Sequence, residues 1–206
     1  WKFKLSKNPD GRPSDFYKDS YNKTAWKSIP VPSNWQFHTE DFPIYTNIIY
    51  PYKIDPPNVP HDYNPVGSYW RTFSIPDDWD KNEIFLHFGS VNSACYVWIN
   101  GIRVGYSEGS KTPIEFNITK FLKSGDNSLA VEVYRWPDGS YLEDQDFWRL
   151  SGIQRDVFIY ASPKICVRDY FVKSKLINDY RDGEFSCEVD LTNYSQNQKN
   201  GKVTLK

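Results

Sequence analysis

Residues 93–106 have the sequence SACYVWINGIRVGY, and this stretch decides the fold class. Two runs rich in β-branched and aromatic residues, 93–99 and 102–106, flank Asn100-Gly101. Asn-Gly between two such runs is the strongest short-range signal of a β-hairpin, because both residues accept the positive φ that the tight turn requires. The sequence therefore predicts an antiparallel hairpin here.

Further strand patterns lie on both sides of this hairpin, and helical periodicity is nearly absent. Short runs bounded by glycine and proline predict strands at residues 68–75, 84–88, 128–134 and 155–161, with a short helical turn near 119–123. Short strands at this spacing, without helices between them, are typical of an antiparallel β-sandwich or jelly roll. We therefore predict an all-β, jelly-roll sandwich.

Residues 31–67 interrupt this pattern. They are rich in proline and aromatic residues and show neither strand nor helix periodicity. Structureless stretches of this length in a compact domain are usually functional segments or linkers. The density of Trp, Tyr, Phe and Ile argues against a solvated linker, so we expect a loop that packs against something large.

The pattern changes again near Ser162-Pro163. Residues 164–206 predict two or three alternating strands, at 165–172, 184–191 and 202–205, which are too few to bury a sandwich core. We therefore predict one β domain over residues 1–163 and the first strands of a second β-sandwich over 164–206. We also expect this sequence to be a piece of a longer protein.

The charge balance excludes two classes of partner. The 206 residues include 25 basic and 26 acidic side chains, which give a net charge of −1. Proteins that bind nucleic acid or anionic membranes carry a basic excess or a basic stripe, and neither is present. The longest wholly apolar run, 94–99, is far shorter than the roughly 20 residues of a membrane helix. We expect no nucleic-acid partner and no membrane partner.

Three cysteines, Cys95, Cys166 and Cys187, are widely spaced and odd in number. This spacing argues against a disulfide scaffold or a thiolate zinc site. Unpaired cysteines in a large protein favour a cytoplasmic location. A periplasmic location stays open, because it depends on residues before Trp1.

Gly105-Tyr106-Ser107-Glu108-Gly109 matches the G-x-S-x-G pattern of a serine nucleophile. That motif requires a strand, a sharp turn and a helix, with a histidine later in the chain. Here the serine ends a hairpin strand, and the last histidine, His87, precedes it. We reject a catalytic triad.

Residues 136–149, with the sequence WPDGSYLEDQDFWR, are called the acidic segment below. They hold four carboxylates among aromatic residues: Asp138, Glu143, Asp144 and Asp146. Crowded carboxylates repel one another unless something compensates their charge. Arg135, Arg149 and Arg155 would do so in a structural role, whereas a hard cation such as Na⁺, Mg²⁺ or Ca²⁺ would use the oxygens as ligands. The residues alone leave both alternatives open.

Residues 141–157, YLEDQDFWRLSGIQRDV, resemble the β-galactosidases of glycoside hydrolase family 2. Similar matches follow in order along residues 1–163: VPSNWQ at 31–36, PIYTN at 43–47, PPNVP at 56–60, GSVNSA at 89–94 and WING at 98–101. A shorter pattern, aromatic-x-x-x-Gly-Ile-x-Arg, is shared with β-glucuronidases and β-mannosidases. The longer acidic form is narrower and disfavours those sister activities.

This resemblance implies a jelly-roll, sugar-binding domain followed by an immunoglobulin-like β-sandwich that the chain only begins. It implies a parent enzyme that is a retaining β-galactosidase of terminal β-D-galactosides such as lactose, and a homo-oligomer. In that family a TIM barrel carries both catalytic glutamates, and no residue here matches either one. We therefore expect no catalytic residue in this chain and no hydrolysis by the chain alone.

The resemblance also implies that two residues reach into the active site of the barrel. Asn47 would hydrogen-bond galactosyl hydroxyls, and Asp146 would ligate a Na⁺ and meet the galactosyl hydroxymethyl group. The other Na⁺ ligands, and any Mg²⁺ of the parent, would lie outside this chain. The structural alternatives are an Asx turn at Asn47 and a salt bridge from Asp146 to Arg149 or Arg155.

Two other functions stay open. Aromatic residues form 17% of the chain, so a self-sufficient carbohydrate-binding module could present a platform of Trp or Tyr to a saccharide. A purely architectural β domain would instead hold the barrel and a subunit interface together. In that case substitutions at Asn47 and Asp146 would change stability but not specificity.

Overall fold

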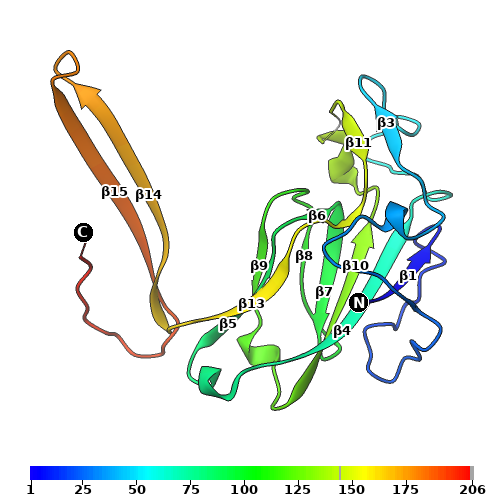
Figure 1. Cartoon of the computed structure of the whole chain (residues 1–206), viewed down its shortest axis with the longest axis horizontal. Helices are drawn as coiled ribbons and strands as arrows, with labels where there is room; N and C mark the ends of the chain where they lie inside the picture. Colours follow the sequence, from blue (N-terminus) through cyan, green and yellow to red (C-terminus); the bar gives the residue numbers. More distant parts are fainter. Residues whose placement is uncertain (144, 205–206) are drawn as a thin grey trace. The chain divides into compact units, whose positions relative to one another are not determined.

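A computed structural model describes residues 1–143 and 145–204, and its regular elements are β-strands and short 3-10 helices (Figure 1). The strands are β1 (Lys2–Ser6), β2 (Lys27–Ser28), β3 (Ile44–Thr46), β4 (Val66–Ser74), β5 (Glu83–Phe88), β6 (Val91–Asn92), β7 (Ala94–Ile99), β8 (Ile102–Ser107), β9 (Ile114–Asn117), β10 (Asp126–Tyr134), β11 (Phe147–Arg149), β12 (Gly152–Ile153), β13 (Val157–Ser162), β14 (Ile165–Ile177) and β15 (Asp182–Asn193). The 3-10 helices are η1 (Trp35–Phe37), η2 (Asp77–Trp79), η3 (Thr119–Phe121) and η4 (Asp138–Tyr141). None of the helices in the described ranges has the length and apolar character that crossing a membrane requires. The all-β prediction is confirmed.

The chain divides into two compact units. The first comprises residues 1–76 with 84–160, and the second comprises 77–83 with 161–206. The second unit contains the antiparallel hairpin β14–β15, whose strands were predicted at 165–172 and 184–191 and are longer than predicted. Apolar side chains of this hairpin are exposed, among them Phe171, Leu176 and Phe185. One hairpin cannot bury such side chains by itself.

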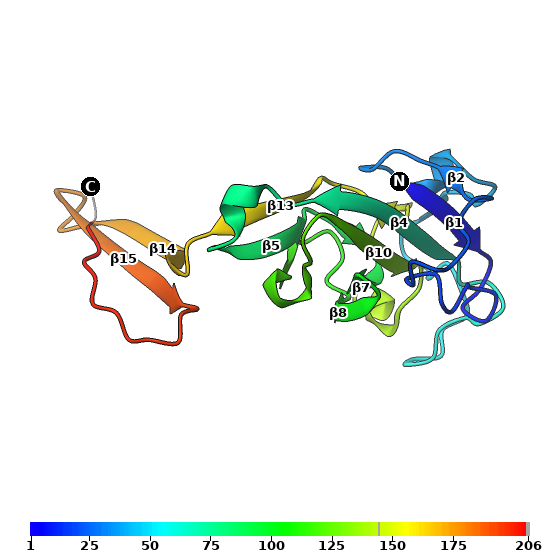
Figure 2. The same cartoon turned by 90° about the horizontal axis from the view of Figure 1, so that it is seen from below.

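The first unit is built on a six-stranded antiparallel sheet with the order β2-β1-β4-β10-β7-β8. Its centre is the pair β4–β10, which runs from Ser74↔Asp126 to Val66↔Tyr134 (Figures 1 and 2). A second sheet has the order β13-β5-β9. The two sheets meet where Gly105 of β8 faces Phe116 of β9, because a Cβ at Gly105 would collide with that ring. The β-sandwich prediction is confirmed.

The period of two along the strands gives the six-stranded sheet two apolar faces. On one face Val131 is paired with Tyr69 and Val97, and all three are fully buried. On the other face Ala130 is paired with Trp70 and Trp98. Two rings from the segment after β1, Phe16 and Trp26, cover this second face. Both faces of the sheet are therefore shielded.

The Asn100-Gly101 turn has the predicted conformation. Asn100 has φ 51° and Gly101 has φ 80°, and they join the paired strands β7 and β8. These left-handed values are the ones that a tight hairpin turn demands. The predicted strand at 202–205 is wrong for the described residues 202–204, which carry no regular structure, and Leu205 lies outside the described residues. No strand within 1–143 and 145–204 pairs with this run, and a lone strand has no ladder to hold it.

The long loop, residues 31–67, is more structured than predicted, since it contains η1 and β3. Asp41 anchors the loop. Nη1 of Arg135 donates hydrogen bonds to both oxygens of the Asp41 carboxylate, at 2.8 and 2.9 Å. Trp35 donates its Nε1–H to Oδ2 at 2.6 Å, Gln36 donates Nε2–H at 2.9 Å, and the Tyr63 hydroxyl donates to Oδ1. The side chains of Arg135 and Asp41 are 0% and 1% exposed. A buried charge pair with this many donors holds the loop on the end of β10.

Arg135 also ties two further segments to the loop. Its Nη2 donates to the carbonyls of Phe42 and Arg149, each at 3.1 Å. Burial, followed by the hydrogen bond to Asp41, raises the pKa of Tyr63 to about 12, so its hydroxyl stays a neutral donor near pH 7. The loop, β10 and the acidic segment therefore meet at one guanidinium.

We predict that Asp41→Asn destabilises the first unit strongly. An asparagine keeps the shape of the side chain but leaves the buried Arg135 charge without its counter-charge, which costs roughly 3–5 kcal/mol. Urea unfolding followed by tryptophan fluorescence measures the loss. The matched control is Asp15→Asn, since Asp15 pairs with Lys18 while both side chains are half-exposed; it should change the free energy of unfolding by less than about 1 kcal/mol. Equal effects of the two substitutions would contradict the anchoring role.

Candidate functional site

A short antiparallel ladder brings the two predicted site residues together. Strand β3 pairs with β11 in the register Thr46↔Phe147, Tyr45↔Trp148 and Ile44↔Arg149. Asn47 directly follows Thr46, and Asp146 directly precedes Phe147. Both residues therefore lie at the same end of the ladder, one on each strand, and both are exposed.

The side chain of Arg149 holds the two strands of the ladder together. This arginine is 5% exposed and donates to the hydroxyl of Thr46 through Nε at 3.2 Å and Nη2 at 2.9 Å. Its guanidinium lies 4.2 Å from the ring centre of Phe147, and the ammonium of Lys111 lies 3.2 Å from that ring. Cations over an aromatic face add attraction to such packing. The pair Thr46 and Phe147, which adjoins Asn47 and Asp146, is thus held by Arg149 of the ladder and by Lys111 of another segment.

Asp146 has a partner that the sequence did not predict. The Tyr45 hydroxyl donates to its Oδ1 at 2.6 Å, and the Tyr45 and Trp148 rings lie 5.5 Å apart. This hydrogen bond raises the pKa of Tyr45, so the phenol remains a donor at neutral pH. The sequence offers one signal for this contact, a tyrosine two residues before Asn47. That signal does not identify Asp146 as the partner of the tyrosine.

Asn47 makes a local contact. Its Oδ1 accepts the N–H of Ile48 at 2.8 Å. An Asx turn would bond the backbone two residues ahead instead. The side chain is exposed, and it is oriented by its own backbone rather than by a distant residue.

The other carboxylates of the acidic segment do not form one cluster. Glu143 accepts the N–H of Ser110 at 3.1 Å and the hydroxyl of Ser93 at 3.2 Å, while Asp138 accepts the N–H of Gly139 at 3.1 Å. Asp144 lies outside the described residues. Within 1–143 and 145–204, no three His, Cys, Asp or Glu side chains are placed to hold a metal ion. A cation at Asp146 would need oxygens from elsewhere.

Tyrosines join the acidic segment to the later part of the loop. The Tyr50 hydroxyl donates to the carbonyl of Tyr141 at 2.8 Å, and the Tyr141 hydroxyl donates to the carbonyl of Asn58 at 2.7 Å. The Tyr141 hydroxyl oxygen also accepts a hydrogen bond from the N–H of Asp55 at 3.0 Å. Residues 50–58 and the acidic segment therefore stabilise one another.

Both segments that form the ladder carry exposed apolar side chains. Ile48 is 86% exposed, Leu142 is 89% exposed and Trp148 is 57% exposed. These side chains come from the same two segments that carry Asn47 and Asp146. Exposed apolar groups gathered in this way are typical of a contact surface.

Comparison with known proteins agrees with this architecture. Residues 1–163 match the model of glycosyl hydrolases family 2, sugar binding domain. The chain is 50% identical over 198 residues to a β-galactosidase of Priestia megaterium, covering 94% of this chain and 19% of that protein. It is 48% identical over 191 residues to a β-galactosidase of Vibrio vulnificus, covering 93% of this chain and 18% of that protein.

Solved structures share the fold. A β-glucuronidase from an uncultured Clostridium species superposes with a TM-score of 0.71 at 24% identity, over 93% of this chain and 32% of that one. The chain spans about a fifth of the length of the curated relatives it matches. With its β-sandwich and the match over residues 1–163, the chain belongs to glycosyl hydrolase family 2, as the part that holds the family's sugar binding domain.

Proposed function

We propose that this chain is the N-terminal, sugar-binding portion of a retaining β-galactosidase, and that Asn47 and Asp146 supply galactosyl contacts to an active site in another domain of the parent. The observation that carries the proposal is the β3–β11 ladder, which has these two residues at one exposed end. The β-galactosidases that resemble this chain at 48% and 50% identity support the substrate class.

The chemistry of the two side chains suits a sugar. The amide of Asn47 offers both a donor and an acceptor to hydroxyl groups. The carboxylate of Asp146 accepts one hydrogen bond from Tyr45 and has lone pairs left for a hydroxyl. Neither residue is required to transfer a proton, so their contribution is stronger binding of the transition state. The catalytic glutamates of the proposed enzyme would lie in the parent's TIM barrel.

Asp146 also fits part of a Na⁺ site. Hard cations prefer oxygen ligands, and an exposed carboxylate that is already oriented by Tyr45 is suited to provide one or two. One carboxylate is too few, so the remaining ligands would come from the parent outside this chain. When bound, the cation would supply a positive charge beside the galactosyl hydroxymethyl group.

The apolar surface around the ladder supports contact with the rest of the parent. Ile48 and Leu142 are strongly exposed, and they belong to the two segments that carry the proposed sugar contacts. Covering them would exclude water from the place where the hydrogen bonds to sugar form, and hydrogen bonds to charged groups are stronger in dry surroundings.

The same surface favours the architectural alternative, in which this domain only braces the barrel. The two functions differ in what Asn47 and Asp146 do. A brace predicts that substitutions there change unfolding but leave substrate specificity intact, whereas the proposed function predicts changed kinetics in a stable protein.

For the full-length parent enzyme we predict that Asp146→Asn lowers kcat/KM for a β-galactoside by roughly 10- to 100-fold, the equivalent of one hydrogen bond to a charged group. It should also weaken the dependence of the rate on Na⁺. Steady-state kinetics over a Na⁺ series, with KCl holding the ionic strength constant, measures both effects.

Asp138→Asn is the matched control, because Asp138 is an exposed carboxylate of the same segment that accepts a local backbone N–H. We expect it to leave kcat/KM unchanged. If Asp146→Asn has wild-type kinetics at every Na⁺ concentration, Asp146 has no role in the sugar site.

Tyr45→Phe tests the orientation of Asp146 separately. Removing one hydroxyl should raise the Na⁺ concentration for half-maximal rate by roughly three- to tenfold, while the rate at saturating Na⁺ stays near wild type. Tyr50→Phe removes a hydroxyl from the same loop that bonds a backbone carbonyl instead, and serves as control. An equal Na⁺ response of the two variants would rule out a specific role for Tyr45.

A further inference from the structure

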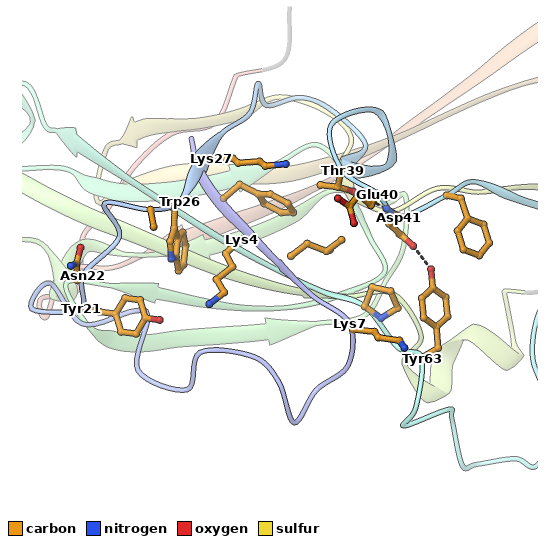
Figure 3. A pocket seen from close by; sticks show the side chains of 15 residues that line it. Lys4, Lys7, Tyr21, Asn22, Trp26, Lys27, Thr39, Glu40, Asp41 and Tyr63 are labelled. Atoms are coloured by element: carbon orange, nitrogen blue, oxygen red, sulfur yellow. Dashed lines mark hydrogen bonds between the residues drawn. The ribbon is translucent and has the colours of Figure 1, made fainter.

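A cavity lies in the first unit, at the outer edge of β1 (Figure 3). Its volume is about 640 Å³, within the range of ligand cavities. Three segments line it: residues of β1, the stretch 21–27 and the turn 39–42, with Tyr63 and Pro65 at one end. Figure 3 shows Tyr21, Asn22 and Trp26 on one side of Lys4, and Glu40 and Tyr63 on the other. Neither Asn47 nor Asp146 lines this cavity.

The cavity is the place where a β-ladder opens. Trp1 and Ile29 exchange two backbone hydrogen bonds of 3.0 Å, and Phe3 pairs with Lys27 in the same register. In this register the next pair to exchange backbone hydrogen bonds would be Leu5 and Ala25. The chain turns away there instead, and the N–H of Trp26 bonds to the carbonyl of Lys23 at 3.1 Å. Both Leu5 and Ala25 line the cavity.

The open ladder leaves backbone groups at the edge of the sheet. In an antiparallel pair every second residue directs its N–H and C=O to the same side. Trp1 and Phe3 point theirs toward β2, so Leu5 points its own toward the cavity. Among the described residues no strand pairs with this edge beyond Phe3. Such an edge is a template for an added strand.

The charged side chains around the cavity determine the sign of the charge on a segment that would bind there. Lys4, Lys7 and Lys27 line it, against one free carboxylate, Glu40. Asp41 also lines it, but its charge is engaged by Arg135. The excess of positive charge attracts an acidic segment and repels a basic one.

The lining combines aliphatic and aromatic side chains. Leu5, Ala25 and Pro65 are its aliphatic members. The ring of Trp26 stacks on Phe16 with ring centres 6.0 Å apart, and Tyr63 stacks on Phe42 at 5.9 Å, so one face of each of these two lining rings is covered. Such a lining suits the apolar side chains of an extended peptide.

We propose that this cavity receives an extended, acidic segment of a partner polypeptide, which adds to the outer edge of β1 as a further strand beside Leu5. The lysines at the rim pair with its carboxylates, and the aliphatic lining takes its alternate side chains. This site is independent of the sugar contacts at Asn47 and Asp146.

The probe is an acetylated, amidated hexapeptide that alternates valine and glutamate, titrated calorimetrically into the 206-residue chain and into the parent enzyme. We expect saturable binding to both proteins, and none of a peptide with lysine in place of glutamate. A peptide N-methylated at the residues that would bond Leu5 should lose binding, and one N-methylated at the alternate residues should keep it.

Two variants test the site in the protein. The double substitution Lys4→Glu with Lys27→Glu should weaken the acidic peptide by roughly tenfold or more at low salt, and Ala25→Trp should abolish binding by filling the cavity. Lys81→Glu, an exposed lysine that does not line the cavity, is the control and should leave the affinity unchanged. Near-UV circular dichroism establishes that each variant is folded.

Four outcomes would overturn the proposal. If titration with the acidic peptide gives no saturable heat, the edge of β1 accepts no added strand, and the lysines serve only to prevent edge pairing. Equal binding of the acidic and basic peptides, or unchanged affinity in the folded variants, would mean that the cavity is not the site. Binding to the isolated chain but not to the parent would mean that the parent's own polypeptide covers this edge. None of these results affects the kinetic tests at Asp146.

Discussion

The buried pair of Asp41 and Arg135 is the interaction on which the irregular part of this domain depends. The two residues are 94 positions apart, and each is linked to more than one segment. Asp41 gathers donors from η1 and from Tyr63, while Arg135 reaches the carbonyls on either side of the β3–β11 ladder. A loop of this length has few backbone partners of its own, so its conformation follows from which donors the carboxylate must satisfy. Burying both charges costs desolvation, and removing either partner would leave the other charge buried and unpaired.

From this anchor the order extends to the exposed end of the ladder. Arg135 holds the carbonyl of Arg149, Arg149 holds the hydroxyl of Thr46, and Thr46 precedes Asn47. On the opposite strand Phe147 follows Asp146, and the cations of Lys111 and Arg149 lie 3.2 and 4.2 Å from the centre of its ring. A ladder of three residue pairs would be marginal in isolation. Its stability comes from the buried side chain of its own Arg149 and from two residues of other segments, Arg135 and Lys111, and this support positions the exposed polar groups at its end.

The regular part of the fold could be predicted from the sequence because its signals are local. Asn100-Gly101 specifies its turn within two residues, and the strands around it follow from period and from glycine and proline. The site divides differently. Asn47 and Asp146 were reached through family resemblance, and their common position at the end of one ladder depends on a pairing that β3 is too short to signal. Tyr45 and Asp146, like Asp41 and Arg135, are joined across about a hundred positions, and no periodicity records such contacts. For the described residues 202–204 the prediction of a strand was wrong for the opposite reason: alternation was present, but a strand exists only with a neighbour.

Under the proposed function, the value of this arrangement lies in fixing two side chains in advance. A contact strengthens catalysis only if its position is fixed before the sugar arrives, since ordering a flexible side chain would cancel much of the gain. Asp146 meets that condition through Tyr45, and the ladder meets it through two arginines that are themselves buried. In the described residues, the carboxylates of the acidic segment have separate donors: Gly139 for Asp138, Ser110 for Glu143 and Tyr45 for Asp146. Asp146 is therefore free to direct its remaining lone pairs outward, and its carboxylate is the part of the acidic segment best suited to a ligand that comes from outside the chain.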